Sequence, residues 1–423
     1  MKRYESYKDS GVRWIGKIPN HWSCVKVKHL LRERVDKSED GIGEPLSMSQ
    51  KYGLIPTSQM DVVPNLATSY VGAKRTRQGD MVLNKLKAHL GVFALSAYDG
   101  LVSPDYAVYY GTGRADLEYL EYLFKTPMYV SEFIKKTTGV AIGFNRLYTD
   151  DLFSIPAHCP PMQEQKRIVD YLKGKTLKIE QYVSARERER ELLDSLKQSE
   201  IANVVTKGLN PNVRMKDSGI PWIGLIPEHW EVKKIRTCFQ ERREKVSDKD
   251  FSPLSVSKMG VTPQLDTAVK TDNGDNRKKV CKGDFVVNSR SDRKGSCGFS
   301  SYDGSVSLIN IVLQPRGVNG MYYNYLFRSN NYIEEFYSQG RGIVADLWTT
   351  RYSEMKNIYI PVPPLKEQQA IVDYIEAKLS KIDSCMADLQ AEIDYLKEFK
   401  QRLISDVVTG QICVTKPQKG EKL

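Results

Sequence analysis

The chain has 423 residues, with 63 lysines and arginines against 52 aspartates and glutamates, a formal net charge of +11. Its length suggests two or three domains. The sequence has no apolar run of the roughly 20 residues that cross a bilayer, so a membrane-spanning protein is excluded and no membrane partner is expected. Seven cysteines without a Cys-x-x-Cys pair argue against a disulfide framework or a zinc ribbon. No apolar segment follows the first residues, so we expect a cytoplasmic protein.

The most informative feature is an internal repeat. Residues 8–22 recur as residues 216–230 with eleven of fifteen positions identical, and both copies contain the motif Trp-Ile-Gly-x-Ile-Pro-x-His-Trp. A second motif, Pro-Pro-x-x-Glu-Gln, occupies 160–165 and 363–368. Because both motifs occur twice in the same order, we predict a tandem duplication whose halves are related by pseudo-twofold symmetry.

The segments between these motifs, about 24–158 and 232–361, have diverged. They combine short apolar runs with short helical patterns, which predicts mixed α/β structure. They share only a Gly-Asp pair (79–80 and 283–284) and a Tyr-Asp-Gly triplet (98–100 and 302–304). Similar ends with dissimilar middles are expected when two copies of a binding unit share a scaffold but recognise different targets.

A long helix is predicted after each diverged segment, from 161 to 207 and from 364 to 409. Each stretch lacks an internal proline, begins at a Pro-Pro pair and ends before Gly208 or Gly410. In the second helix, apolar residues alternate at spacings of four and three, which predicts a coiled-coil seam of Ile375, Leu379, Ile382, Met386, Leu389, Ile393 and Leu396, continued by Leu403 and Val407. The first helix matches it at Leu172, Ile179, Val183 and Leu193, but has Thr176, Arg186 and Arg190 at the other seam positions.

Together these elements predict an α+β (mixed) fold. Two similar globular domains are expected, separated by two long antiparallel coiled-coil helices, and the net positive charge makes DNA a candidate ligand of both. The predicted parts are a first globular domain at 1–159, a first long helix at 160–208, a second globular domain at 209–362, a second long helix at 363–410 and a tail at 411–423.

No catalytic or metal-binding pattern was found. Gly174-Lys175-Thr176 lacks the earlier glycine of a phosphate-binding loop and lies inside the first long helix. The five histidines have no metal-ligand spacing. His21 and His229 precede the tryptophans that close the repeated opening motif, so both are expected to serve packing.

The candidate DNA-binding residues are basic clusters at matching places in the two halves. Charge favours both regions, with 21 basic against 17 acidic residues in 1–160 and 23 against 17 in 209–362. Arginine and lysine bind guanine edges or phosphates, aspartate accepts from cytosine, and serine binds either kind of base. The alternative is a set of solvated turns. The candidates are Lys74, Arg75, Arg77, Lys85, Lys87, His89 and Arg146 in the first half, and Arg277, Lys278, Lys279, Ser289, Arg290, Asp292, Arg293, Lys294 and Arg341 in the second.

In its two repeated motifs, Trp-Ile-Gly-x-Ile-Pro-x-His-Trp and Pro-Pro-x-x-Glu-Gln, the chain resembles the specificity (S) subunit of type I restriction-modification enzymes. One departure is that residues 155–159 before the first Pro-Pro motif appear two residues longer than residues 360–362 before the second. The resemblance implies a non-catalytic subunit that binds double-stranded DNA through two target recognition domains, 1–159 and 209–362, each reading one part of a split target. The long helices would fix the spacer and dock two methyltransferase (M) subunits. The resemblance implies no cofactor on this chain. S-adenosylmethionine would belong to the M subunits, and ATP and Mg to restriction (R) subunits.

Two other classes of protein remain open at this point. One is a coiled-coil scaffold that joins two protein-binding modules, for which DNA affinity would be weak and insensitive to salt. The other is an enzyme with an unrecognised site, for which the purified chain alone would turn over a substrate.

Overall fold

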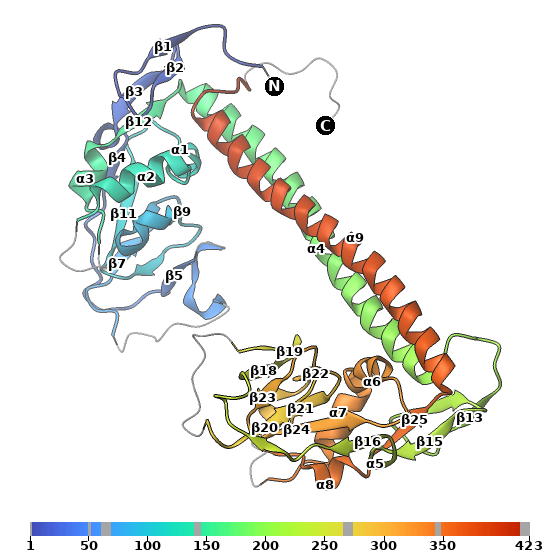
Figure 1. Cartoon of the computed structure of the whole chain (residues 1–423). Coiled ribbons are helices and arrows are strands. Elements are labelled where there is room, and N and C mark those ends of the chain that lie inside the picture. Colours follow the sequence, from blue (N-terminus) through green and yellow to red (C-terminus); the bar gives the residue numbers. More distant parts are fainter. Residues whose placement is uncertain are drawn as a thin grey trace. The chain divides into compact units, whose positions relative to one another are not determined.

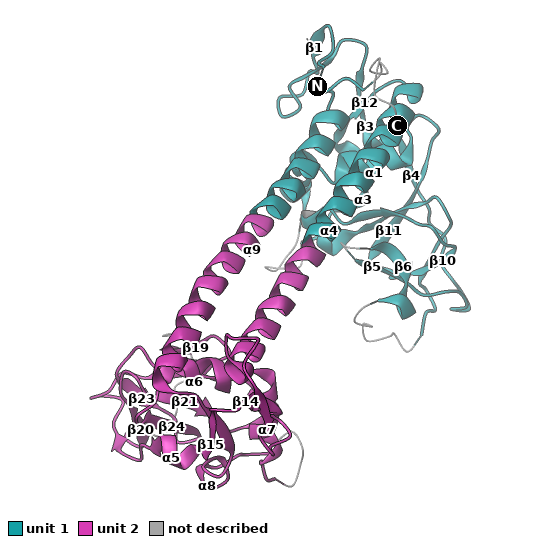
Figure 2. Cartoon of the chain, turned by 90° about the vertical axis from the view of Figure 1, so that its right-hand side faces the viewer, with its two compact units in different colours: residues 1–186, 391–423 teal, residues 187–390 magenta. Residues whose placement is uncertain are grey.

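The computed structural model describes residues 2–49, 52–60, 69–138, 145–264, 274–342 and 348–414. The chain forms two compact units, unit 1 (1–186 and 391–423) and unit 2 (187–390), which Figure 2 shows in separate colours. Two long helices, α4 (Met162–Lys207) and α9 (Leu365–Val408), cross the boundary between the units. Each unit therefore contains the beginning of one long helix and the end of the other.

Unit 1 mixes short strands with short helices (Figure 1). Before α4 its elements are β1 (Tyr7–Asp9), β2 (Lys17–Pro19), β3 (Ser23–Lys26), η1 (Val27–His29), β4 (Leu31–Glu33), β5 (Leu46–Ser49), β6 (Gly53–Pro56), η2 (Thr57–Gln59), β7 (Lys74–Thr76), β8 (Met81–Asn84), η3 (Lys85–Leu90), β9 (Phe93–Leu95), β10 (Gly100–Val102), β11 (Tyr106–Gly111), α1 (Leu117–Phe124), α2 (Pro127–Lys136), α3 (Thr149–Ser154) and β12 (Pro156–Cys159).

Unit 2 has nearly the same succession of elements between the two long helices. These are β13 (Met215–Asp217), β14 (Leu225–Pro227), β15 (Glu231–Lys234), α5 (Ile235–Cys238), β16 (Phe239–Glu241), β17 (Lys245–Val246), β18 (Leu254–Ser257), β19 (Gly260–Pro263), β20 (Arg277–Val280), β21 (Phe285–Asn288), η4 (Ser291–Arg293), β22 (Cys297–Phe299), β23 (Gly304–Val306), β24 (Asn310–Pro315), α6 (Gly320–Phe327), α7 (Asn330–Ser338), α8 (Tyr352–Met355) and β25 (Tyr359–Val362).

The sheets of the two units correspond one to one. The largest sheet has the strand order β4-β11-β8-β9 in unit 1 and β16-β24-β21-β22 in unit 2. Around it lie the hairpins β1-β2, β5-β6 and the pairs β12-β3 and β10-β7, matched in unit 2 by β13-β14, β18-β19, β15-β25 and β17-β20-β23. Neighbouring strands within these sheets pair antiparallel. The diverged segments thus keep a common scaffold although their sequences share few residues.

Each unit has a large aromatic core. Trp22, Tyr119 and Phe124 are fully buried in unit 1, as are Trp230 and Tyr322 in unit 2. Burying one such ring stabilises a fold by roughly 2–3 kcal/mol. A smaller apolar cluster lies under the β5-β6 hairpin and another under β18-β19. Trp22 and Trp230, which close the repeated opening motif, are therefore core residues.

The two repeated motifs meet in one junction in each unit. In unit 1, Glu164 Oε2 lies 2.7 Å from His21 Nε2, and its Oε1 accepts from the Tyr4 hydroxyl at 2.7 Å. In unit 2, Glu367 Oε2 lies 2.8 Å from His229 Nε2. The glutamate of the Pro-Pro-x-x-Glu-Gln motif therefore bonds the histidine of the opening motif in both copies, which explains why the two motifs recur together.

The glutamine of the same motif fixes the start of each long helix. Gln165 accepts from the backbone N–H of Asp116, the residue that caps α1, at 2.8 Å. Gln368 accepts in the same way from Asn319, which caps α6, at 2.8 Å. Both glutamines are buried, so the helix start is tied to a neighbouring helix by a bond shielded from water.

Glycine ends both long helices. Gly208 and Gly410 have φ of +74° and +77°, the left-handed conformation that glycine adopts without steric cost. A Cβ on Gly208 would lie 3.2 Å from the Trp230 ring, and one on Gly410 would lie 2.6 Å from Pro19. The end of α4 is therefore seated on the opening motif of unit 2, and the end of α9 on that of unit 1.

Within each unit the two long helices pack side by side along the predicted seam. The seam residues of α9 are buried or half-buried, and most of the residues between them are exposed. In unit 2, Lys197 pairs with Asp383 at 2.6 Å. In unit 1, Lys400 pairs with Glu180 at 3.0 Å and Arg186 with Glu392 at 3.1 Å. The residue numbers of the paired side chains increase along α4 while they decrease along α9, so the two helix segments run antiparallel in unit 1.

The structure corrects one sequence comparison. Pro156–Cys159 pairs with β3 as Tyr359–Val362 pairs with β15, and these partners keep the same offsets along the chain. Ile155 is thus equivalent to Ile358, and there is no two-residue insertion before the first Pro-Pro motif. The Ile-Pro dipeptide simply occurs at different positions of the same strand in the two units. Residues 415–423 of the predicted tail lie outside the described residues.

Candidate nucleic-acid interface

Two equivalent loops follow the central strands of the two units. We call residues 85–90, which form η3, loop 1, and residues 289–294, which include η4, loop 2. The backbone carbonyl of Lys85 accepts from Leu147 N–H at 3.2 Å, and that of Ser289 accepts from Thr350 N–H at 2.9 Å. Lys85 and Ser289 are therefore equivalent. The loops share a backbone setting but carry different side chains.

Loop 1 begins in a cluster of cations. Burial and the nearby charge of Lys74 lower the pKa of Lys85, and Arg146 adds to the effect, while Asp105 and Glu33 oppose it. Lys74 lies 3.5 Å from Glu33, and Arg146 pairs with Asp105 at 3.1 Å. Since its pKa is lowered, Lys85 stands to gain from a nearby anion such as a DNA phosphate.

The other unit 1 candidates differ in their surroundings. Arg75 pairs with Asp40 at 3.1 Å and donates to Ser38 Oγ at 3.2 Å, so it is engaged within the protein. Arg77 and Lys87 are exposed. The side chain of His89 and the glycine-rich segment 139–143 lie outside the described residues.

Loop 2 carries exposed charge of both signs. Arg290 Nε lies 3.0 Å from Asp292 Oδ1, and Arg293 Nε lies 3.9 Å from Asp292 Oδ2. The side chains of Arg290 and Arg293 are 44% and 67% exposed. Lys294 instead pairs with Glu334 at 2.9 Å. The two arginines are the side chains of this loop best placed to meet a ligand.

Two unit 2 candidates are not at the surface. Arg277 is 4% exposed, and its guanidinium donates to Ser305 Oγ at 2.8 Å and to the Ser305 carbonyl at 3.0 Å. Ser289 is 3% exposed and donates to the Ile309 carbonyl at 2.6 Å. Each of these side chains is bonded inside the fold instead of being presented at the surface.

Lys278 and Lys279 are largely engaged in the protein. Lys278 Nζ donates to the Asn310 carbonyl at 2.7 Å and lies 3.8 Å from Glu241, and burial lowers its pKa. Its pairing matches that of Lys74 with Glu33 in unit 1, which indicates a shared structural role. Lys279 pairs with Glu244 at 2.9 Å.

Arg146 and Arg341 are not equivalent to each other. In unit 1, Arg146 forms a β-bridge with Thr138, and in unit 2, Arg341 forms one with Thr349. Thr349 and Thr350 stand where Arg146 and Leu147 stand in unit 1, as the contacts of the two loops show. In unit 1 the arginine is the second residue of the bridge along the chain, and in unit 2 it is the first. The positive charge therefore lies at different places in the two units.

Sequence reasoning missed an arginine–aspartate pair in each unit. Arg34 binds Asp80 through two hydrogen bonds of 2.8 and 2.9 Å, and Arg242 binds Asp284 through two of 2.7 and 3.1 Å. These contacts explain the shared Gly-Asp motif. A signal existed, because a Glu-Arg pair at 33–34 recurs at 241–242 with the same offset as the opening motif.

A second missed feature lies beside loop 2, at the tip of the β18-β19 hairpin. Arg328 donates to the Lys258 carbonyl at 2.6 Å, and a Cβ on Gly295 would lie 3.9 Å from the Lys258 side chain. Met259, next in sequence, is 84% exposed. The hairpin tip thus places the exposed Lys258 and Met259 next to loop 2.

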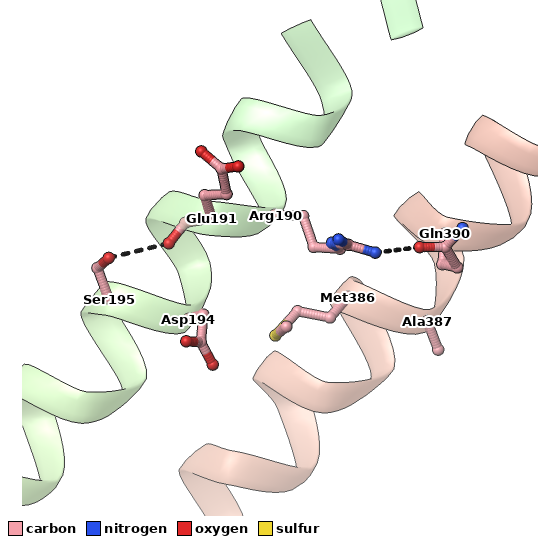
Figure 3. A pocket seen from close by; sticks show the side chains of 7 residues that line it. All are labelled: Arg190, Glu191, Asp194, Ser195, Met386, Ala387 and Gln390. Carbon is pink, nitrogen blue, oxygen red and sulfur yellow. Dashed lines mark hydrogen bonds between the residues drawn. The ribbon is translucent and has the colours of Figure 1, made fainter. Parts of the chain in front are cut away.

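The long helices carry a groove in unit 2. Figure 3 shows Arg190 reaching from α4 toward Gln390 on α9, to which it donates a hydrogen bond. Met386 lies nearby, and the groove has a volume of about 600 Å³. Arg190 occupies a seam position, where an arginine is unable to fill the space as leucine would. The packing of the helix pair is therefore interrupted here.

No membrane or metal feature is found in the part of the chain that the structure describes. None of the described helices is long and apolar enough to cross a membrane. Within the same residues, no group of three or more histidine, cysteine, aspartate or glutamate side chains could hold a metal ion.

Residues 227–395 match the family described as type I restriction modification DNA specificity domain. The chain is 22% identical over 436 residues to a putative type I restriction enzyme MjaX specificity subunit of Methanocaldococcus jannaschii, covering 95% of this chain and 96% of that protein. It is 20% identical to the type I restriction enzyme EcoKI specificity subunit of Escherichia coli K12, covering 94% and 90%.

Solved structures agree on the fold. The HsdS subunit from Thermoanaerobacter tengcongensis superposes with a TM-score of 0.53 at 15% identity, covering 93% of this chain and 98% of that one. A chain from a structure on complex assembly and conformational transition of the type I R-M system gives 0.66 at 15% identity, covering 93% and 99%. Together the comparisons show that this chain is similar to specificity subunits of type I restriction-modification systems and shares the fold of the solved ones.

Proposed function

We propose that this chain supplies the DNA specificity of a type I restriction-modification complex, with each unit reading one half of a bipartite target in double-stranded DNA. The observation that carries this proposal is the pair of equivalent loops. Loop 1 and loop 2 occupy the same place in one scaffold, yet loop 1 presents Lys87 and loop 2 presents Arg290 and Arg293. A shared frame with different exposed side chains suits two half-sites of different sequence.

The long helices serve as spacer and docking surface in this proposal. We take α4 and α9 to form an antiparallel coiled coil that joins the duplicated units and sets the distance between the half-sites.

The repeated junctions, built on Glu164 and Glu367, offer two similar surfaces for two M subunits. A mass measurement of the complex at saturating M subunit should give two M copies for each copy of this chain, and a one-to-one complex would contradict the docking proposal.

The chemistry of the complex belongs to its partners. S-adenosylmethionine would be held by the M subunits, and ATP and Mg by R subunits, while this chain contributes recognition alone. Calorimetry of the purified chain should therefore detect no binding of S-adenosylmethionine or ATP. A tight site for either compound would contradict a purely recognising role.

The decisive experiment expresses the chain with its cognate M subunit and maps methylated adenines by methylation-aware sequencing. We expect one motif of two short specified parts separated by unspecified bases. Arg293→Ala should alter one part and Lys87→Ala the other. The proposal fails if no interrupted motif is methylated, or if each single substitution changes both parts equally.

A further inference from the structure

Loop 2 is fixed to the core of unit 2 at both of its ends. The buried Tyr337 hydroxyl lies 2.9 Å from the Asn288 carbonyl oxygen and 3.2 Å from that of Arg293. Ser291 N–H donates to the Trp348 carbonyl at 2.9 Å. A loop held by backbone bonds presents its side chains from a constant position, which base recognition requires.

Asp292 faces both exposed arginines of this loop. Its two carboxylate oxygens lie 3.0 Å from Arg290 Nε and 3.9 Å from Arg293 Nε. An ion pair this exposed contributes little to folding. Asp292 contacts Nε of Arg290, and the opposite edge of the guanidinium, formed by its two terminal nitrogens, makes no bond to the residues that the structure describes. That edge can therefore meet an outside acceptor. That edge matches the O6 and N7 acceptors of guanine in the major groove.

Loop 1 has no counterpart of this pair. Since Lys85 is equivalent to Ser289, the places of Arg290 and Asp292 are taken in unit 1 by Leu86 and Ala88. The paired arginine and carboxylate therefore belong to one unit only, as a specificity determinant should, whereas the Arg34–Asp80 and Arg242–Asp284 pairs occur in both units.

We infer that the half-site read by unit 2 contains a guanine bound by Arg290, and that Asp292 is the positioning residue that orients the Arg290 guanidinium. This inference rests on the proposed function. It differs from the expectation from the sequence, in which the Asp292 carboxylate accepts a hydrogen bond from cytosine. Here the carboxylate is directed at Arg290, and the base contact belongs to the arginine.

The test uses the complex with the cognate M subunit. Methylation rates are measured on duplexes in which each position of the target is changed in turn. Arg290→Lys should reduce the preference for guanine at one position of the unit 2 half-site by on the order of tenfold to a hundredfold. Asp292→Asn should reduce the preference at that same position by a smaller factor and leave the thermal stability unchanged. The unit 1 half-site should keep its preferences.

A control is the more exposed Arg214–Glu228 pair, which lies in the same unit, outside loop 2, at 3.6 Å. Arg214→Lys and Glu228→Gln should leave all base preferences unchanged. The inference is overturned if Arg290→Lys lowers the rate on all duplexes alike, which would mark a phosphate contact. It is also overturned if the affected base is not guanine, or if Asp292→Asn affects a different position. These outcomes leave bipartite reading intact, whereas loss of preference in both half-sites would refute the proposed function itself.

Discussion

Glu164 and His21 stand 143 positions apart in the chain, and their side chains meet at 2.7 Å. Glu164 is 6% exposed and also accepts from Tyr4. Glu164→Ala leaves two polar partners without their acceptor, so we expect a loss of about 1–3 kcal/mol in the free energy of unfolding of unit 1. Urea unfolding of the variant and of the unchanged chain measures this loss. Glu180→Ala, which removes an exposed pair with Lys400, is the control and should cost about 1 kcal/mol at most. Equal effects of the two substitutions would contradict a special role for the junction.

Acid should weaken unit 1 through His158. Burial lowers the pKa of this histidine from 6.5 to about 4, so below pH 6.5 the unfolded chain binds a proton that the folded chain does not. The stabilisation from neutral His158 is complete above pH 6.5 and is lost as the pH falls toward 4, amounting to about 3 kcal/mol.

Hydrogen exchange of peptides from β3 and β12 between pH 4 and 7 reports this change in unit 1. His158→Gln should flatten the pH dependence. The control, His29→Gln at an exposed site, should not. An unchanged pH profile in His158→Gln would show that other groups govern the acid sensitivity.

Removing an exposed cation should change DNA binding, whereas removing a buried one should change the stability of the fold. Arg77 is exposed, so if it binds a phosphate, replacing it with alanine weakens binding to all DNA sequences alike. The slope of log affinity against log salt should then fall by about 0.9 for each phosphate that is no longer neutralised. Arg277→Ala should instead lower the free energy of unfolding by about 1–3 kcal/mol, because its buried guanidinium bonds Ser305. Both quantities should be measured for both variants, by salt titration of DNA binding and by urea unfolding. If Arg277→Ala lowered the salt slope without lowering the stability, Arg277 would be a DNA contact after all.

Lengthening α4 and α9 should increase the spacing between the two half-sites of the target. Four residues inserted after Arg188 in α4 and after Gln390 in α9 would lengthen the pair by about 6 Å, slightly under two base pairs of DNA. We expect the unspecified spacer of the methylated motif to grow by one or two base pairs with both half-sites unchanged. The same four residues inserted after Asn210, in the exposed turn that follows α4, should leave the spacer as it was. An active helix variant with the original spacer would refute the role of the helices as a ruler.

The long helices were predictable because local periodicity determines them, whereas the fate of single charged residues was not. Arg277 and Arg290 look alike in the sequence, each in a polar run near a strand. Arg277 is buried and bonded to Ser305, which lies 28 positions further along the chain, and no local pattern reports such a contact. The apparent insertion before Pro160 arose because an Ile-Pro dipeptide recurs at non-equivalent strand positions. Backbone pairing, which fixes equivalence, is absent from a linear comparison.

Gly208 and Gly410 restrict how genes for this protein can change over evolutionary time. Each glycine has a left-handed backbone and lies against the aromatic anchor of a unit, while Gln165 and Gln368 hold the opposite ends of the helices. Shifting either end by one residue would place a side chain where only hydrogen fits. Insertions and deletions that survive selection should therefore accumulate in the interior of α4 and α9, near Arg186 and Arg190, so that new target spacings arise without any change in the bases recognised.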